Sequence, residues 1–323
     1  MPSAGPDELP RVVLDESSLD FRDVPPPLVV GGLDQLMDTV EVVRADPAAR
    51  IAVAPMWDAV RCLDECELYE LLSGAYPMQV DRDTLRRTYS MLSKLPEWDE
   101  QAVGSVPTAV GINGASPAMA LSVAYALALQ ARGRGTACLV FPPSPRRGFL
   151  PVDSADGTRG RVYFFAHAGG LPEFWRSLYS LENVAEERFF VLGSRAFPRL
   201  VFHADLSFGR FDGSYALLRD RVVEVLAALD DRFLDEYQRC KGVAHDVQAA
   251  LGRYRCDLSP ESPRTRRSDK LMRQRDVVHE GRTYRCEWHA KIEPHRNRIH
   301  FAVCGQELAG RLLVGVFVDH LAT

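Results

Sequence analysis

The sequence predicts an α/β N-terminal domain with βαβ units around a parallel or mixed sheet. A helical segment and a small C-terminal α+β domain with an antiparallel meander are expected to follow. Three observations predict this class. Short apolar runs alternate with helical patterns in the first two thirds of the chain, a long helical period follows, and alternation of apolar and polar residues begins near residue 277. A chain of 323 residues is long enough for two domains.

The composition excludes several classes of protein. Hydrophobic residues make up 46% of the chain and charged residues 26%, as in soluble globular proteins. No apolar run reaches the ~18 to 20 residues that span a bilayer. The first residues, MPSAGPDELPRVVLDE, lack the basic and apolar regions of a signal peptide, and the seven cysteines are odd in number and widely spaced. We expect a cytoplasmic protein with reduced thiols and no membrane partner.

The first βαβ unit is expected directly after an N-terminal arm. Residues 1–26 are rich in Pro, Asp and Ser and predict a flexible acidic segment. The apolar run LVVGG at 28–32 predicts a strand, the spacing of apolar residues at 33–46 predicts a helix, and RIAVAPM at 50–56 predicts a second strand. This order implies a parallel pair of strands.

Two helices are expected next, at 57–74 and 81–95. The first contains Cys62 and Cys66, which a helix would place on one face. A metal could use this pair, but no second pair of Cys or His lies nearby in the sequence, and a closed zinc site takes four ligands. Ordinary helix packing is the alternative explanation of the two cysteines.

A second βαβ unit is predicted from the strand VPTAVGI, an alanine-rich helix and the strand TACLVFPP, between residues 106 and 143. Ser116 fits the N-cap of this helix and Pro117 its first position. The preceding loop contains Gly111, Gly114 and Ser116, where backbone amides could hold the phosphate of a nucleotide. The spacing matches neither G-x-G-x-x-G nor a P-loop, so simple turn formation is the alternative.

The remaining elements set the expected domain boundaries. Further strands are predicted at 160–167, 188–194 and 198–206, which extends the α/β domain over 27–212. A helical segment is expected at 213–256, and a basic antiparallel β module at 257–323.

Charge is distributed unevenly along the chain. Residues 1–110 hold 20 acidic and 9 basic residues, a net charge of −11, whereas residues 264–298 hold 11 basic and 5 acidic residues, a net charge of +6. A basic stretch on an acidic chain indicates a local anionic partner, although a solvated face that complements acidic surface elsewhere is the alternative. The nucleic-acid contacts that we expect are Arg264, Arg266, Arg267, Lys270, Arg273, Arg275, Arg285 and Arg296.

Alternation in the two segments RTYRCEWHAKI and RNRIHFAVC predicts how their strands pair. One register gives an unbroken apolar face, and a slip by one residue would mix the two faces. The apolar pairs in this register are Ala290 with Ile299, Trp288 with Phe301, and Cys286 with Val303. A third strand, GRLLVGVFVDHL, brings His320 toward the opposite, polar face.

The polar face in this register is expected to face solvent, with His289 opposite His300 and Lys291 opposite Arg298. Metal-free cleavage of RNA needs a base, an acid and cations near the phosphorane. Imidazoles suit the proton transfers, and Arg and Lys suit the charge. These four residues are therefore the predicted catalytic set, without metal or cofactor. Three histidines could also bind a metal, but no carboxylate companion of the cross-strand histidines is evident. A solvated polar face, or nucleic-acid contact without chemistry, remains the alternative.

The order from about residue 240 onward is helices, a basic lead-in, then YRCEWHAKI, NRIHFAV and GRLLVGVFVDHL, which resembles the meander of RelE/ParE-like toxins. The resemblance implies a metal-independent ribonuclease that cuts messenger RNA at the ribosome, although the ParE branch targets gyrase. Carried over, Lys291, Arg298 and His300 would be the phosphate and proton-transfer positions, with His289 beside them. The chain is larger than those toxins and ends in VDHLAT, without their frequent terminal basic or aromatic residue.

The sequence therefore predicts a bacterial cytoplasmic protein of a defence or stress system whose C-terminal module engages nucleic acid, RNA more than DNA. In the stronger form of this hypothesis the module also cleaves it. One alternative is a non-enzymatic subunit that binds a protein partner through the acidic N-terminal part. A weaker alternative is a nucleotide-binding α/β enzyme that uses the loop at Gly111 and Gly114.

Overall fold

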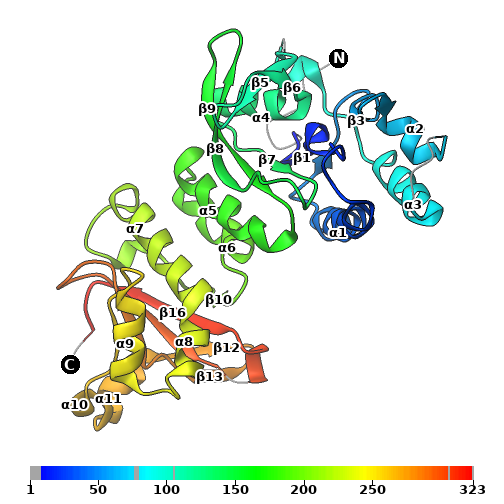
Figure 1. Ribbon diagram of the computed structural model, residues 1–323. Coiled ribbons are helices and arrows are strands. Elements are labelled where there is room, and N and C mark those ends of the chain that lie inside the picture. The colour runs from blue at the N-terminus through cyan, green and yellow to red at the C-terminus, as the bar shows by residue number, and fades with distance from the viewer. Residues whose placement is uncertain (1–8, 76–79, 105, 305, 322–323) are drawn as a thin grey trace. The chain divides into compact units, whose positions relative to one another are not determined.

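The computed structural model describes residues 9–75, 80–104, 106–304 and 306–321 and divides into two compact units, Met1–Phe174 and Trp175–Thr323 (Figure 1). The predicted fold class is confirmed, since a mixed α/β sheet is followed by helices and a mainly antiparallel sheet. A boundary between the two units was expected near residue 212, which is wrong. The units divide within helix α5 (Leu171–Leu181), because the strand near residue 200 joins the C-terminal sheet. Each helix among the described residues is too short or too polar to span a lipid bilayer.

Strand β1 (Val12–Leu14) lies in the parallel part of the N-terminal sheet. Its residues are fully buried, and it pairs in parallel with both β2 and β7. The flexible arm expected over residues 1–26 is therefore wrong from residue 9 onward, because this apolar run fills the sheet; residues 1–8 lie outside the described part. The sheet order is β2-β1-β7-β9-β8-β5-β6, with β2 (Ile51–Ala52), β5 (Ala109–Ile112), β6 (Ala118–Met119), β7 (Ala137–Leu139), β8 (Gly148–Ser154) and β9 (Arg159–Phe165).

Helix α1 (Pro26–Ala45) replaces the strand that was expected at 28–32. Its buried side chains recur every three or four residues from Val29 to Val43, so the run LVV is the first turn of an amphipathic helix. Proline is compatible with that first turn because the helix has no hydrogen-bond acceptor for an N–H there. The predicted βαβ unit is present as β1-α1-β2, with its first strand earlier in the sequence than expected.

Two other predicted elements have a different conformation. The segment at 57–74 forms the short antiparallel strands β3 (Arg61–Leu63) and β4 (Cys66–Glu67) before helix α2 (Leu68–Ser73), so Cys62 and Cys66 do not share a helix face. Both thiols are buried, in agreement with a packing role. The apolar run at 188–194 belongs to helix α6 (Phe189–Ala196). Helix α3 (Arg82–Leu92) lies in the region where a helix was expected.

Helix α4 (Leu121–Ala131) begins five residues after the predicted cap Ser116. Its N-terminus is satisfied by tertiary structure, because the backbone N–H of Ser122 donates to the Glu16 carboxylate at 3.1 Å. Glu16 follows β1 and is buried. Burial, reinforced by the charge of the adjacent Asp15, raises the pKa of Glu16 to about 7.

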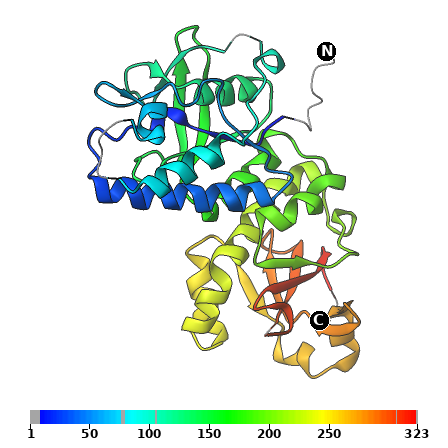
Figure 2. The same ribbon diagram turned by 90° about the vertical axis from the view of Figure 1, so that its right-hand side faces the viewer.

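The C-terminal unit is built on a five-stranded sheet in the order β10-β16-β15-β14-β11. Among the described strands of this sheet, only β10 and β16 pair in parallel. Figure 2 shows helices α8 and α9 along one side of these strands and the short helices α10 and α11 at the other. The strands are β10 (Leu200–Phe202), β11 (Leu258–Pro260), β14 (Trp288–Lys291), β15 (Arg298–Val303) and β16 (Leu312–Val318), and β12 (Asp276–His279) pairs with β13 (Arg282–Arg285). The helices are α7 (Tyr215–Ala228), α8 (Leu234–Arg239), α9 (Ala244–Gly252), α10 (Pro263–Arg266) and α11 (Asp269–Met272).

The register predicted for the meander is confirmed for four consecutive pairs of β14 and β15. Trp288 lies opposite Phe301, and His289 lies opposite His300. The apolar face packs on the helical stretch through Phe233, whose ring centroid lies 5.4 Å from that of Trp288 and 4.9 Å from that of Phe301. The continuous strand expected over 282–292 is instead broken at residues 286 and 287, between β13 and β14.

Cys286 does not pair with Val303, because this break turns its side chain to the other face of the sheet. There it packs in a cluster with Ala302 and Val316. The irregular pairing of β15 with β16 leaves Gly315 without a partner, and a Cβ atom built on Gly315 would lie 2.4 Å from the Cys286 Sγ. The glycine therefore provides the space that Cys286 occupies.

Gly31 and Gly32 provide a matched test of helix α1. A methyl group at Gly31 meets no atom within 4 Å, whereas one at Gly32 would lie 2.6 Å from the buried Phe141 ring. Gly31→Ala is expected to raise the free energy of unfolding by about 0.5 to 1 kcal/mol. Gly32→Ala is expected to lower it by about 1 to 3 kcal/mol through overpacking. Urea denaturation followed by circular dichroism measures both, and equal effects would contradict the helix position.

The raised pKa of Glu16 predicts a pH-dependent stability. Between pH 4.5 and about 7 the folded state holds a proton that the unfolded state has lost, so stability falls as pH rises through this window. Glu16→Gln is expected to remove this decline, which is at most about 3.5 kcal/mol at about 1.4 kcal/mol per tenfold change in protonation equilibrium. Unfolding free energies of both proteins at several pH values test this, with the exposed Glu100→Gln as control for the loss of a carboxylate. Parallel curves for wild type and Glu16→Gln would refute it.

Candidate functional site

A cleft of about 430 Å³ opens on the polar face of the C-terminal sheet. It contains three of the four predicted catalytic residues, His289, His300 and Arg298, together with His320. Polar and cationic side chains dominate its lining. The lining residues are Ser259, Pro260, Glu261, Ser262, Arg264, Thr265, Arg275, His289, Arg298, His300, His320 and Leu321.

The two histidines reach the cleft from neighbouring strands. Because His289 in β14 pairs directly with His300 in β15, their side chains project to the same side, and their ring centroids lie 5.2 Å apart. The expected solvent-facing surface is wrong in one respect. His300 is only 1% exposed, because the segment after β11 covers it, whereas His289 keeps 12% of its side-chain surface.

Glu261 and Arg275 cover this polar face with a buried ion pair. The Arg275 Nε lies 2.6 Å from the Glu261 Oε1, with the two side chains 1% and 4% exposed. The guanidinium also donates to the carbonyl oxygen of Leu271 at 2.8 Å. Arg275 was expected on the nucleic-acid surface, but it is enclosed because a buried carboxylate requires a cationic partner.

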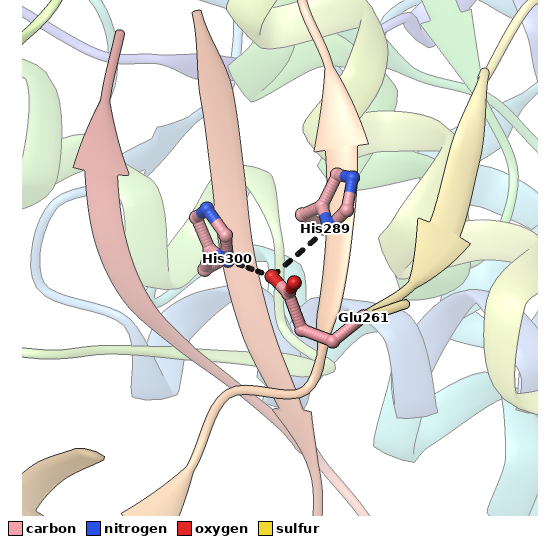
Figure 3. A group of neighbouring side chains, drawn as sticks. All are labelled: Glu261, His289 and His300. Atoms are coloured by element: carbon pink, nitrogen blue, oxygen red, sulfur yellow. Dashed lines mark ion pairs between the residues drawn. The ribbon is translucent and has the colours of Figure 1, made fainter. Parts of the chain in front are cut away.

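Both imidazoles point one nitrogen at the same carboxylate oxygen (Figure 3). The Nδ1 atoms of His289 and His300 lie 3.5 Å and 3.6 Å from the Glu261 Oε1. The other nitrogen of His289, Nε2, lies 3.1 Å from the Ser259 hydroxyl. No carboxylate companion of the histidines is evident in the sequence, and Glu261 is that companion.

The electrostatics of the group favour an ionised Glu261 and a neutral His300. Burial by itself would raise the pKa of Glu261, but His289 and Arg275 outweigh it and lower this pKa to about 2. Burial, with the neighbouring His289 adding to it, lowers the pKa of His300 to about 3. A neutral imidazole next to a carboxylate is the form that a metal ion binds.

The predicted cationic contacts divide into two groups. Lys291, Arg285 and Arg296 each pair with a carboxylate, those of Asp257, Asp276 and Asp212, at 3.0, 2.8 and 2.6 Å. By contrast, five cations before β12 are exposed and have no carboxylate partner within the described residues. They are Arg264, Arg266, Arg267, Lys270 and Arg273, which we call the basic segment.

Arg298 belongs to neither group. Its guanidinium contacts only a backbone carbonyl oxygen, that of Asp319 at 3.4 Å, among the contacts of the described residues, and it lines the cleft. Arg264 also lines the cleft, so the basic segment adjoins the cleft through this residue.

The loop at Gly111 and Gly114 does not have the geometry expected for phosphate binding. It connects β5 to β6 instead of a strand to a helix, and Ser116 is exposed in it. Gly114 and Asn113 both have positive φ, so these residues make a tight turn. The nucleotide site predicted at Gly111, Gly114 and Ser116 therefore lacks its helix N-terminus.

Glu261 and Ser259 were missed because both lie in the segment just before residue 277, where the sequence predicts no strand. The residues CDLSP in that segment have the alternation of a short edge strand, and this was the available signal. Comparison of the chain with protein-family models, curated proteins and solved structures gives no match. The resemblance to RelE/ParE-like toxins accordingly stays a prediction.

Removal of the Glu261 charge is expected to destabilise the C-terminal unit strongly. Glu261→Gln leaves the buried Arg275 guanidinium uncompensated, and we expect a loss of about 3 to 5 kcal/mol in the free energy of unfolding. The matched control is Asp276→Asn, which removes the carboxylate partner of the exposed Arg285 and is expected to cost less than about 1 kcal/mol. Chemical denaturation compares the two, and similar losses would show that the buried pair is not the stronger constraint.

Proposed function

We propose that the C-terminal unit binds nucleic acid, with RNA favoured over DNA, through the cleft and the adjoining basic segment. The observation that supports this most directly is that Arg264 of the exposed basic segment lines the same cleft as Arg298. Unpaired Arg and Lys side chains supply the salt-dependent part of nucleic-acid affinity, because they release condensed counterions from phosphates.

The preference for RNA is argued from the size and chemistry of the cleft. A volume of about 430 Å³ suits a single unstacked nucleotide, and proteins recognise RNA mainly in single-stranded segments whose bases enter such pockets. Arg298 and Arg264 would contact phosphates at the cleft, and His289, unlike the buried His300, keeps exposed surface. The resemblance to RelE/ParE-like toxins favours the same substrate class.

Cleavage by the pair of histidines has weaker support than binding. A general acid or base must reach the substrate, and the 1% exposed His300 lies beneath its neighbours. Lys291, the other predicted catalytic cation, is paired with Asp257. We therefore propose nucleic-acid binding as the function. Metal-free catalysis by His289, His300, Lys291 and Arg298 is a separate hypothesis that goes further than binding.

A docking surface for a protein partner on the acidic N-terminal part is the alternative that the sequence suggests. Several of its carboxylates are already engaged within the unit, since Arg87 of α3 lies within 3.3 to 3.8 Å of Asp34, Asp38 and Glu41 of α1. No specific observation in the described residues favours such a partner, so nucleic-acid binding is the function that we put forward.

Loss of three cations of the basic segment is expected to weaken RNA binding. Relative to wild type, the variant Arg264→Ala/Arg266→Ala/Arg267→Ala should bind a labelled single-stranded RNA less tightly. It should also lower the slope of log affinity against log salt by up to about 2, at about 0.7 per phosphate contact. Fluorescence anisotropy at several salt concentrations measures both quantities, and DNA of the same sequence tests the RNA preference.

The control variant is Arg285→Ala/Arg296→Ala, because those guanidiniums already have carboxylate partners. It should keep nearly the wild-type affinity and salt slope. Binding that is independent of salt in the wild type, or an unchanged slope in the triple variant, would exclude the proposed surface.

A further inference from the structure

We propose that Glu261, His289 and His300 bind a divalent transition-metal ion of the zinc class, with a coordination position open to the cleft. This differs from the metal-free site expected from the sequence. Within the described residues, one ligand atom from each of these three side chains lies within 4.8 Å of the other two. Two imidazoles and one carboxylate are a ligand set that zinc and neighbouring first-row ions accept.

The distances of the two imidazoles from Glu261 fit a shared ion better than direct hydrogen bonds. Ligands about 2.0 to 2.2 Å from a tetrahedral zinc ion are about 3.3 to 3.6 Å apart from one another. The two Nδ1 atoms lie 3.5 Å and 3.6 Å from the Glu261 Oε1 (Figure 3). A direct imidazole–carboxylate hydrogen bond would be nearer 2.7 to 3.2 Å.

Unmet hydrogen-bonding capacity points to the same position. The Nδ1 of His289 and both ring nitrogens of His300 are buried and have no hydrogen-bond partner among the described residues. Buried polar atoms in proteins are almost always satisfied by protein, water or an ion. His300 is 1% exposed and aims its Nδ1 at the carboxylate, so an ion there would satisfy both Nδ1 atoms at once.

The surrounding residues supply the supporting contacts that metal ligands usually have. Ser259 lies 3.1 Å from the His289 Nε2 and can accept its proton, which leaves Nδ1 free to bind a metal. Arg275 fixes one side of the Glu261 carboxylate, and the same oxygen keeps a second lone pair. These contacts hold two of the three ligands in place without the ion.

Three protein ligands leave a position for a fourth group, as in catalytic zinc sites. A divalent ion beside Arg275, with Arg264 and Arg298 on the cleft wall, gives this position a net positive surrounding that favours an anionic oxygen ligand. That ligand is a phosphate oxygen if the proposed nucleic-acid function holds. The metal site itself does not depend on that function.

The test is a titration of the untagged, chelator-treated full chain with Co²⁺, followed by visible absorption, and with Zn²⁺, followed by calorimetry. One equivalent of Co²⁺ should give the intense bands of a four- or five-coordinate ion. His289→Ala should weaken binding by at least about 100-fold, and Ser259→Ala, which removes a supporting hydrogen bond, by about 10- to 100-fold. The control His295→Ala removes an exposed histidine of the same unit and should bind as wild type.

Circular dichroism of each variant establishes that it is folded, and the exposed position of His295 and the partly exposed position of Ser259 make folding of those variants expected. A spectrum of hydrated Co²⁺ in the wild type, or equal affinity of wild type and His289→Ala, would overturn the site. A thiolate charge-transfer band would place the ion on cysteines and also overturn it. Inorganic phosphate should change the Co²⁺ spectrum, and no change would refute the open position. RNA binding measured without metal separates failure of this site from failure of the proposed function.

Discussion

The buried ion pair between Glu261 and Arg275 is the interaction on which the arrangement of the C-terminal unit depends. Either charge alone would be costly at 4% or 1% exposure, so the two side chains must meet. Glu261 follows the edge strand β11, and Arg275 precedes β12. Their contact therefore fixes both ends of the intervening turns, and these turns carry the five exposed cations of the basic segment. A structural constraint inside the unit thus positions a charged surface outside it.

The two faces of the C-terminal sheet differ because of one register and two interruptions. Pairing of β14 with β15 sends Trp288 and Phe301 to the helical side and both histidines to the other. The break before Trp288 and the unpaired Gly315 then let Cys286 pack on the histidine side of the sheet, in a cluster with Ala302. That side of the sheet consequently contains an apolar cluster and a polar pocket next to each other. In the pocket, the imidazoles of both histidines point toward the Glu261 carboxylate.

The positive charge of the region 264–298 has two uses. Some of the cations, such as Lys291, Arg285 and Arg296, form ion pairs with carboxylates within the fold. Exposed pairs of this kind contribute little to stability, but they remove cations from the set that can contact a polyanion. The remaining charge is concentrated on the basic segment and on Arg298, close to the histidines. Proximity of unpaired cations, imidazoles and a carboxylate is what makes the cleft the best candidate for function.

The sequence by itself determined the local features that depend on neighbouring residues. Alternation of side chains fixed the pairing of His289 with His300, because a shift by one residue would have exposed Trp288 and Phe301. Helical period and apolar runs determined the α/β class. Tertiary structure decided what depends on residues far apart in the chain. Glu16, and not the predicted cap Ser116, accepts a hydrogen bond from a backbone N–H at the start of α4. Strand β1, which lies in the segment expected to be a flexible arm, is part of the N-terminal sheet. Tertiary structure also decided that Glu261 and Arg275 enclose the histidines. The free-energy cost of burying a charge depends on its partner in space, and no local pattern in the sequence identifies that partner.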